Sequence, residues 1–407
     1  MIQFKKYLPE VIIERTSYLN KALAFKDSGL IKLFIGQRRV GKSYMLFQVM
    51  KRIHSENKSA NLVYINKEHP DFQMIQDEKS LINYIEPRKQ NGENYLFIDE
   101  VQEIESFVNL LRGLLATGQW NIWCTGSNAI LLSQDIAGLL SGRVITQEIH
   151  PLNYREFLIF HKLTPGRKSL EKFLRYGGLP HLIRLSLEDD IVYEYLKGIY
   201  STILFKDVVA RHNIKNIYFL ERLVAYCADT TGSLLSAKKI SDFLISQKVN
   251  IAPVRVLEYL RFLTQAFFLN QSRRFDLKGK RILEVGEKYY FADLGLRNAI
   301  AGFRTIDLSK IIENAVMLNM QSQGFKIFTG SINQKEVDFV CERNHERIYI
   351  QVALRITDET VFDREFGNLK MIEDNFPKYV VTFDDFVGNT VEGIIQINLL
   401  DFLNIDF

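Results

Sequence analysis

Glycines, a lysine and a serine stand at the spacing G-x-x-x-x-G-K-[ST] in residues 36–43, Gly-Gln-Arg-Arg-Val-Gly-Lys-Ser. An apolar run, residues 31–35, precedes them, and apolar residues recur at helical spacing over 44–53. A glycine loop between a strand and a helix directs backbone N–H groups and the helix dipole at phosphates. A glycine turn with a chance lysine explains this agreement less well. We therefore predict a nucleotide site in which Lys42 reaches the β- and γ-phosphates and Ser43 ligates Mg²⁺. Its binding residues are Gly36, Gln37, Arg38, Arg39, Val40, Gly41, Lys42, Ser43 and Tyr44.

Two acids end the apolar run Tyr95-Leu96-Phe97-Ile98-Asp99-Glu100. Ligands of an open α/β sheet bind at the carboxyl ends of its strands, so this run is typical of a Walker B strand. Asp99 is expected in the Mg²⁺ shell, and Glu100 is expected to orient and deprotonate the attacking water. The alternative is a strand that ends in a solvated acidic turn. A glutamate after the aspartate favours hydrolysis of the nucleotide over binding alone.

A third apolar run, residues 120–124, ends in Thr125-Gly126-Ser127-Asn128. The Asn128 amide is our candidate sensor of the γ-phosphate or the attacking water, with Ser127 as a substitute. Asn128 equally suits the cap of a following helix, and both interpretations stay open.

Strands and helices alternate from about residue 30 to 151, after an N-terminal helix. This alternation predicts an α/β domain, a parallel sheet with helices on both faces. We place a P-loop NTPase core at residues 1–152.

These motifs together resemble a prokaryotic family of AAA-type P-loop ATPases that carry a C-terminal domain of unknown function. The resemblance covers nearly the whole chain. Beyond the motifs above it includes Gly142-Arg143-Val144, Pro151-Leu152, Glu156, Phe157, Tyr176-Gly177-Gly178-Leu179-Pro180 and Glu336-Val337-Asp338-Phe339. It implies ATP as the nucleotide and a homo-oligomer, a ring or a transient one. It also implies that Arg143, on the loop 139–144, reaches the nucleotide of a neighbouring subunit; an ordinary surface arginine is the alternative.

Residues 153–218 have a helical pattern and are expected to form a lid, as in AAA-type proteins, or a plain helical bundle.

Residues 219–304 have winged-helix character. A capped helix from Ser236 and a turn through 248–252 precede a helix that starts at Pro253. Its predicted apolar face is Val256, Leu257, Leu260 and Leu263. Two β-type runs then flank the basic residues Arg273, Arg274, Lys278, Lys280 and Arg281. Such a segment could contact DNA phosphates, or it could contact protein with its charges in solvent.

Residues 305–407 resemble a restriction-endonuclease-like α/β domain. In that fold a helix glutamate, a strand aspartate and an acid-x-lysine pair hold Mg²⁺. Glu313 and Asp338 match, but Gln351-Val352-Ala353 replaces the acid and the lysine. Gln351 can still offer an oxygen to a metal, and Arg355 or Lys335 would have to supply the cation. We therefore expect a degenerate site, in a domain that otherwise binds or oligomerises.

Length, charge and cysteine content limit which other classes of protein this chain can belong to. The chain has 407 residues and a net charge of +4, so any nucleic-acid surface must be local. Its three cysteines have no metal-ligand spacing, and reduced thiols in a cytoplasmic protein are expected. Neither a signal peptide nor a membrane span is predicted.

The leading hypothesis is an ATP-hydrolysing switch or motor that acts on DNA or on a protein client. An ATP-regulated, metal-dependent DNA nuclease is the first alternative. The second is a nucleotide-gated DNA- or protein-binding module with negligible turnover.

Overall fold

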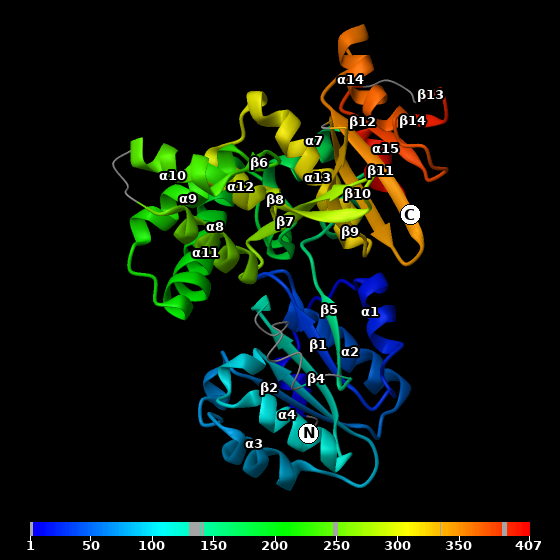
Figure 1. The fold of residues 1–407 in the computed structure, drawn as a ribbon. Coiled ribbons are helices and arrows are strands. Elements are labelled where there is room, and N and C mark those ends of the chain that lie inside the picture. Colours follow the sequence, from blue (N-terminus) through cyan, green and yellow to red (C-terminus); the bar gives the residue numbers. More distant parts are fainter. Residues whose placement is uncertain (1–2, 130–139, 141, 247–250, 334, 385–388) are drawn as a thin grey trace. The chain divides into compact units, whose positions relative to one another are not determined.

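The computed structural model describes residues 3–129, 140, 142–246, 251–333, 335–384 and 389–407 (Figure 1). Parts of the predicted loop 139–144 and turn 248–252 therefore lie outside the described residues. The chain divides into two compact units, Met1–His150 and Pro151–Phe407, and each is described by itself.

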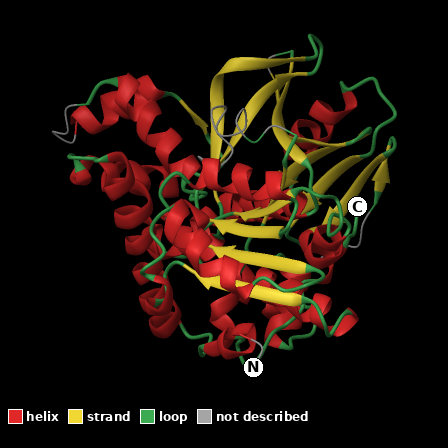
Figure 2. Cartoon of the chain, turned by 90° about the horizontal axis from the view of Figure 1, so that it is seen from below, coloured by secondary structure: helices red, strands yellow, loops and turns green. Residues whose placement is uncertain are grey.

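Unit 1 contains a five-stranded parallel sheet in the order β2-β3-β4-β1-β5, which confirms the predicted α/β core (Figure 2). From β1 the chain crosses past the positions of β4 and β3 to form β2 at one side of the sheet, and it then returns towards β1 through β3 and β4. Right-handed crossovers therefore place α2 on one face and α3 and α4 on the other. The elements are α1 (Thr16–Leu23), β1 (Ile31–Ile35), α2 (Lys42–Glu56), β2 (Asn61–Asn66), α3 (Glu78–Ile85), β3 (Asn94–Asp99), α4 (Phe107–Thr117), β4 (Asn121–Gly126) and β5 (Val144–Glu148).

Burial explains why these strands are nearly continuous apolar runs. Every residue of β1 and β3 is buried, as expected for parallel strands covered on both faces. The carboxyl ends of β1, β3 and β4 carry the predicted P-loop, the acid pair and the candidate sensor. Because parallel strands end at one edge of their sheet, the sequence motifs gather there.

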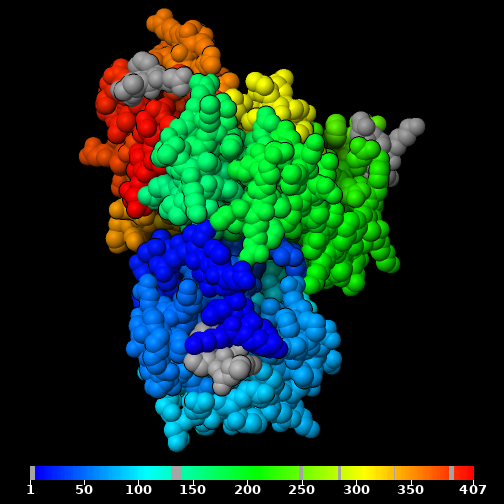
Figure 3. Space-filling view, turned by 180° about the vertical axis from the view of Figure 1, so that it is seen from behind, coloured from blue at the N-terminus to red at the C-terminus, as the bar shows by residue number. Residues whose placement is uncertain are grey.

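Unit 2 begins with helices: α6 (Tyr154–His161), α7 (Arg167–Tyr176), α8 (Asp189–Thr202), a π-helix (Ile203–Ala210) and α9 (Ile217–Asp229). There follow β6 (Leu234–Leu235), α10 (Ala237–Ser246), α11 (Pro253–Gln265), the hairpin strands β7 (Leu269–Asp276) and β8 (Arg281–Phe291), and α12 (Leu294–Ala301). Helix α12 packs against α7, α8 and α9. Figure 3 shows the residues of the green range, which includes α8 and α9, together on one face of the unit. Helix α11 starts at Pro253 as predicted, but Leu257 is exposed while Val256, Leu260 and Leu263 are buried.

The remaining elements are α13 (Leu308–Ser322), β9 (Lys326–Ile332), β10 (Lys335–Arg343), β11 (Glu346–Ala353), α14 (Glu359–Lys370), β12 (Lys378–Thr382), β13 (Thr390–Val391), β14 (Ile394–Asn398) and α15 (Leu399–Asn404). The strands of unit 2 form one mixed sheet, β13-β14-β12-β11-β10-β9-β7-β8-β6. Strands β9, β10 and β11 are antiparallel neighbours, and β11, β12 and β14 are parallel.

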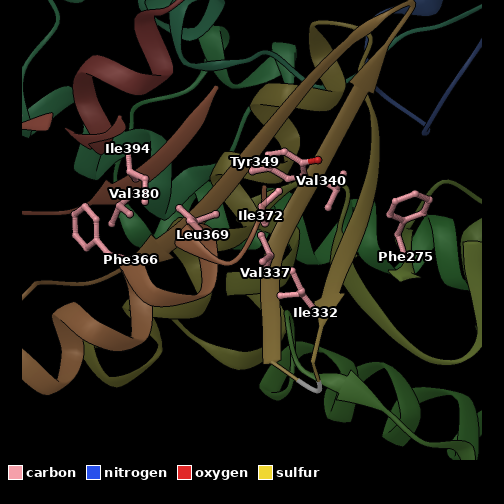
Figure 4. Close-up of a cluster of buried hydrophobic side chains, with 10 residues drawn as sticks. All are labelled: Phe275, Ile332, Val337, Val340, Tyr349, Phe366, Leu369, Ile372, Val380 and Ile394. Carbon is pink, nitrogen blue, oxygen red and sulfur yellow. The ribbon is translucent and has the colours of Figure 1, made fainter. Parts of the chain in front are cut away.

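The apolar core of this sheet lies under α14 (Figure 4). Phe366 and Leu369 of α14 belong to the same buried cluster as Val337 and Val340 of β10 and Val380 of β12. Because β7 pairs with β9, the hairpin of the predicted 219–304 domain and the strands of the predicted 305–407 domain belong to one sheet. The four-part division of the chain stays a prediction.

The Tyr176-Gly177-Gly178-Leu179-Pro180 motif packs closely against two other segments of unit 2, around Leu152 and Asp293. The Asp293 carboxylate accepts hydrogen bonds from Gly178 N at 2.7 Å and Leu296 N at 3.0 Å. A Cβ atom on Gly178 would lie 2.2 Å from the Leu152 carbonyl oxygen, so only glycine fits there.

The cysteines Cys124, Cys227 and Cys341 are buried, free thiols, and burial raises the pKa of each. Among the described residues, no helix combines the length and apolarity needed to cross a membrane.

Candidate functional site

The loop between β1 and α2 is shaped by two glycines. Gly36 has φ of 140°, and a Cβ atom there would lie 2.3 Å from the Ile149 carbonyl oxygen. Gly41 has φ of 97° and directly precedes α2, whose N-terminus is capped by no side chain. Uncapped N–H groups at a helix N-terminus with a favourable dipole are what a phosphate requires.

Lys42 lies across this loop. Its Nζ donates to the carbonyl oxygens of Gly36 and Gln37, both at 3.0 Å, and lies 3.9 Å from Glu100 Oε1. The Lys42 side chain is 4% exposed and the Glu100 side chain 12%. The ammonium group is thus held at the helix N-terminus, opposite Glu100, the residue that follows β3.

The acid pair is fixed by a threonine on the neighbouring strand. Thr125 of β4 donates its hydroxyl hydrogen to Asp99 Oδ1, and Thr125 Oγ1 accepts from Glu100 N at 2.8 Å. Tyr64 donates to Asp99 Oδ2 at 3.2 Å. Glu100 has φ of 58°, a left-handed conformation that is costly for a residue with a Cβ atom.

The charge state of Asp99 depends on its surroundings. Burial raises the pKa of Asp99 to about 6, and the neighbouring charge of Glu100 acts in the same direction. Hydrogen bonds to the Thr125 and Ser43 hydroxyls and the Lys42 charge oppose the rise. Ser43 therefore lies beside Asp99, so a hydroxyl and a carboxylate oxygen are available to one hard cation.

The other predicted binding residues surround the loop. Arg38 forms an ion pair with Glu68 at 2.9 Å, while Arg39 and Tyr44 are exposed. Val40 is buried, and its carbonyl oxygen accepts from the buried Arg15 at 3.5 Å. Gln37 is 1% exposed, and its amide oxygen and nitrogen have no hydrogen-bond partner in the described part of the chain. These features fit a Mg²⁺-bound polyphosphate. They are the uncapped N-terminus of α2, the Gln37 amide, the buried Lys42, and the Ser43–Asp99 pair.

Asn128 and Arg143 lie at opposite ends of the parallel strands, Asn128 at the carboxyl ends and Arg143 at the amino ends. Asn128 is buried two residues beyond the carboxyl end of β4, on the edge that carries the P-loop. Arg143 is exposed and directly precedes β5, and its carbonyl oxygen accepts from Ile31 N at the start of β1. Five residues of parallel strand, on the order of 15 Å, therefore separate Arg143 from the P-loop edge. Arg143 cannot serve the nucleotide site of its own chain.

Two residues near the acid pair were not predicted as site members. Thr125 was recognised only as part of a strand end, because its contacts come from the register of β3 beside β4. Gln102 donates to Glu100 Oε2 and to Ser127 Oγ, the second at 3.4 Å. Its position two residues after Glu100 was the only signal in the sequence.

A second group of ionisable residues lies in unit 2, around Lys288 of β8. Lys288 Nζ is 2.7 Å from Glu336 Oε1, 3.0 Å from Glu313 Oε1 and 3.4 Å from Asp338 Oδ1. The Lys288 side chain is 3% exposed. The two predicted acids, Glu313 and Asp338, are thus brought together, with a lysine that the sequence pattern did not indicate.

Gln351 lies beside the same group, because its Oε1 accepts from Asp338 N at 3.3 Å. Val352 N donates to Asp338 Oδ2 at 2.9 Å. The alternatives for a displaced cation, Arg355 and Lys335, are exposed, whereas Lys288 is buried. Among the described residues, no group of three or more histidines, cysteines, aspartates or glutamates could hold a metal ion.

A comparison with protein families agrees with the P-loop geometry. Residues 28–158 match the family described as an AAA domain, and residues 167–307 match a domain of unknown function, DUF8612. An uncharacterized protein of Methanocaldococcus jannaschii is 29% identical over 95% of this chain and 91% of its own length. The solved Walker-type ATPase of Pyrococcus abyssi covers 71% of this chain and 96% of its own, with 17% identity and a TM-score of 0.47.

An uncharacterized protein of Haemophilus influenzae is 30% identical to this chain over 403 residues, which are 97% of this chain and all of the relative. Because the match runs from end to end and includes the AAA domain, this chain belongs to the family of that protein, a family of AAA-type P-loop ATPases.

Proposed function

We propose that unit 1 binds ATP with Mg²⁺ and hydrolyses it at the edge of the sheet formed by β1, β3 and β4. The observation that carries this proposal is the convergence of Lys42, Asp99 and Glu100 at the uncapped N-terminus of α2. A cation for the phosphates, a carboxylate for the metal and a second carboxylate for water are the parts that phosphoryl transfer to water requires.

Each residue has one proposed task. The loop backbone and Lys42 bind the β- and γ-phosphates, and Ser43 and Asp99 hold Mg²⁺. The metal neutralises charge that develops on the phosphate oxygens. Glu100 orients the attacking water and accepts its proton, since its carboxylate lies 3.9 Å from Lys42 and is held by Gln102. Asn128, at the same edge, is proposed to contact the γ-phosphate or that water.

Steady-state phosphate release by the full chain tests the proposal. We expect Lys42→Ala to lose nucleotide binding and turnover together, because the phosphates lose their cation. Glu100→Gln should bind ATP and lose turnover by about 10²–10⁴-fold, the usual effect of removing a general base. Full turnover in Glu100→Gln would contradict the role of that carboxylate.

We further propose that nucleotide state is transmitted to unit 2, so that the protein works as a switch or motor in a homo-oligomer with Arg143 in trans. The order α9-β6-α10-α11-β7-β8 supports the winged-helix interpretation, and the basic residues of the β7–β8 hairpin are its candidate DNA contacts. Stimulation of turnover by DNA that weakens steeply with salt would support DNA as partner. Turnover without such stimulation favours a protein client, and negligible turnover with tight ATP binding favours a nucleotide-gated binding module.

A second candidate is metal-dependent cleavage of DNA by unit 2. It is favoured by the element order α13-β9-β10-β11-α14-β12, and by Glu313 and Asp338 sharing one buried lysine. Lys288 would supply the ammonium group that Ala353 cannot. Mg²⁺-dependent nicking of plasmid DNA that is lost in Asp338→Ala supports this candidate. Nicking that persists in Asp338→Ala excludes Asp338 as its metal ligand.

A further inference from the structure

The end of the π-helix in unit 2 presents two basic residues to α11. The π-helix Ile203–Ala210 continues directly into Arg211 and His212. Helices of this kind are rare, usually extend over a single turn and frequently occur at functional sites. The His212 ring stacks on Phe262 of α11, with the ring centres 3.7 Å apart and the ring planes 10° apart. One aromatic contact therefore fixes the end of the π-helix against α11.

Three polar atoms at this junction are buried without a hydrogen-bond partner in the described part of the chain. They are Arg211 Nη1, His212 Nε2 and Gln265 Oε1. Gln265 follows Phe262 by three residues in α11, so the two side chains lie on one face of that helix. Unpaired buried polar groups are costly, and each one calls for a bound partner. Several such atoms at one junction therefore point to a polar ligand.

Two arginine charges lie close to the His212 ring. Burial lowers the pKa of His212, and the charges of Arg211 and Arg261 lower it further, whereas Glu258 acts in the opposite direction. Arg261 is exposed, and its guanidinium carbon lies 5.7 Å from the centre of the Phe262 ring. The Arg211 side chain is 20% exposed, so a ligand can reach it from solvent.

The acids near this junction do not match its positive charge. Glu258 already forms an ion pair with Arg255 at 2.5 Å, and Asp207 Oδ1 is 4.0 Å from Arg211 Nη2. Together with Arg261, three arginines thus accompany two acids. A guanidinium group presents N–H donors in a planar fork that matches the oxygens of a phosphate. The surplus charge and the unused donor of Arg211 both favour an oxyanion.

We propose that Arg211, His212 and Arg261 form a binding site for a phosphate group at the junction of the π-helix and α11. Arg211 Nη1 and the Arg261 guanidinium donate to the phosphate oxygens. His212 adds a third donor in the tautomer that carries its hydrogen on Nε2. The phosphate belongs to a nucleic-acid backbone, since α11 is part of the proposed winged-helix segment, or to a free phosphate compound. The site requires neither ATP hydrolysis in unit 1 nor DNA contact by the β7–β8 hairpin.

Calorimetric titration of the full chain with inorganic phosphate tests the site, at an ionic strength kept constant with sodium chloride. The parent chain carries Lys42→Ala, which weakens phosphate binding at the P-loop. We expect Arg211→Gln and Arg261→Gln each to weaken phosphate binding by at least about fivefold, because each removes a charge-assisted donor. Arg222→Gln is the matched control, since Arg222 is an exposed arginine of α9, and it should leave the affinity unchanged.

The exposed Arg261 keeps the test decisive if Arg211→Gln does not fold, because loss of a solvent-exposed side chain leaves the core intact. Phosphate binding that is equal in the parent and in Arg261→Gln overturns the proposal, and so does a parent that binds no phosphate. An equal loss in Arg222→Gln also overturns it, because the effect would then come from net charge alone.

A fluorescently labelled DNA duplex distinguishes the two sources of the phosphate group. Its affinity is measured at several salt concentrations. If DNA supplies the phosphate, Arg211→Gln and Arg261→Gln each lower the slope of log affinity against log salt by about one. An unchanged slope, or no DNA binding, together with weakened phosphate binding supports a free phosphate compound as the ligand. The phosphate titration decides the proposal in either case, and it does so independently of ATP turnover in unit 1.

Discussion

Thr125 connects the two acids of unit 1 through a single oxygen atom. Its hydroxyl donates to Asp99 and accepts from the backbone N–H of Glu100, which has a left-handed backbone. The threonine thus positions both carboxylates without a direct role in the proposed chemistry. A strained backbone of this kind persists only where neighbouring contacts enforce it.

We expect Thr125→Val to retain ATP binding and to lower turnover by about 10-fold or more, because a misplaced carboxylate loses much of its catalytic effect. The effect should lie in kcat, and Thr125→Ser, which keeps the hydroxyl, should recover most of the activity. Stopped-flow phosphate release and equilibrium binding of a fluorescent ATP analogue separate the two quantities. A drop in binding with unchanged kcat would contradict the positioning role.

The local motifs could be predicted at the scale of residues because their spacing within the sequence reflects one loop or one strand end. The glycines, Lys42 and Ser43 belong to one turn, and Asp99 and Glu100 end one strand. Thr125 and Lys288 escaped prediction because each meets its partners across strands that are distant in sequence. Periodicity within one strand carries no information on which neighbour it faces.

At the scale of elements, the close packing of Gly178 against Leu152 predicts a clear effect of a single methyl group. A Cβ atom at 178 would lie 2.2 Å from a backbone oxygen that cannot yield without a shift of the chain. We expect Gly178→Ala to destabilise unit 2 by about 1–3 kcal/mol, the range of overpacked sites. The thermal midpoint of unfolding measures this.

Gly198 provides the matched control, because it lies within α8 and a Cβ atom there would meet nothing within 4 Å. Gly198→Ala should stabilise the chain by about 0.5–1 kcal/mol through helix propensity. Equal changes in stability on the two substitutions would show that close packing at Gly178 does not constrain the 176–180 motif.

Lys32 makes the stability of unit 1 dependent on pH. Lys32 is 3% exposed within β1, and burial lowers its pKa from 10.5 to about 8. Between these two values the unfolded chain binds more protons than the folded chain, so stability rises with pH. Relative to Lys32→Met, the wild type should gain about 1–2 kcal/mol between about pH 7.5 and 9.5. Urea denaturation at the two pH values measures this difference, and a constant difference would contradict the burial of a charged Lys32.

The architecture of unit 1 could be predicted from the alternating strand and helix patterns of the sequence, whereas that of unit 2 could be predicted only in part. Helices such as α11 and α13 were predicted, with Leu257 assigned to the wrong face. The joining of the hairpin to the later strands was missed, because pairing of β7 with β9 depends on contacts that no local pattern encodes.

At the scale of the whole molecule, the position of Arg143 carries a prediction about assembly. Arg143 lies at the amino end of β5, while the P-loop lies at the carboxyl end of β1, so a role of this arginine in hydrolysis requires the nucleotide site of another copy. Arg143→Ala and Lys42→Ala should each have little turnover alone.

Mixing the two variants should restore part of the activity, because Arg143→Ala keeps an intact P-loop and Lys42→Ala still supplies the arginine. The recovered turnover should depend on total protein concentration. An inactive mixture, at concentrations where native mass spectrometry detects mixed oligomers, would show that Arg143 is an ordinary surface residue.

The central claim is that the carboxylate of Glu100 activates water at a nucleotide held by the P-loop. Its most direct test is a single-turnover measurement, in which excess protein binds radiolabelled ATP with Mg²⁺ and phosphate release is then followed in time. We predict that the wild type releases phosphate, and that Glu100→Gln binds the same amount of ATP but releases phosphate at least 100-fold more slowly. Equal rates of release in the two proteins would contradict the account.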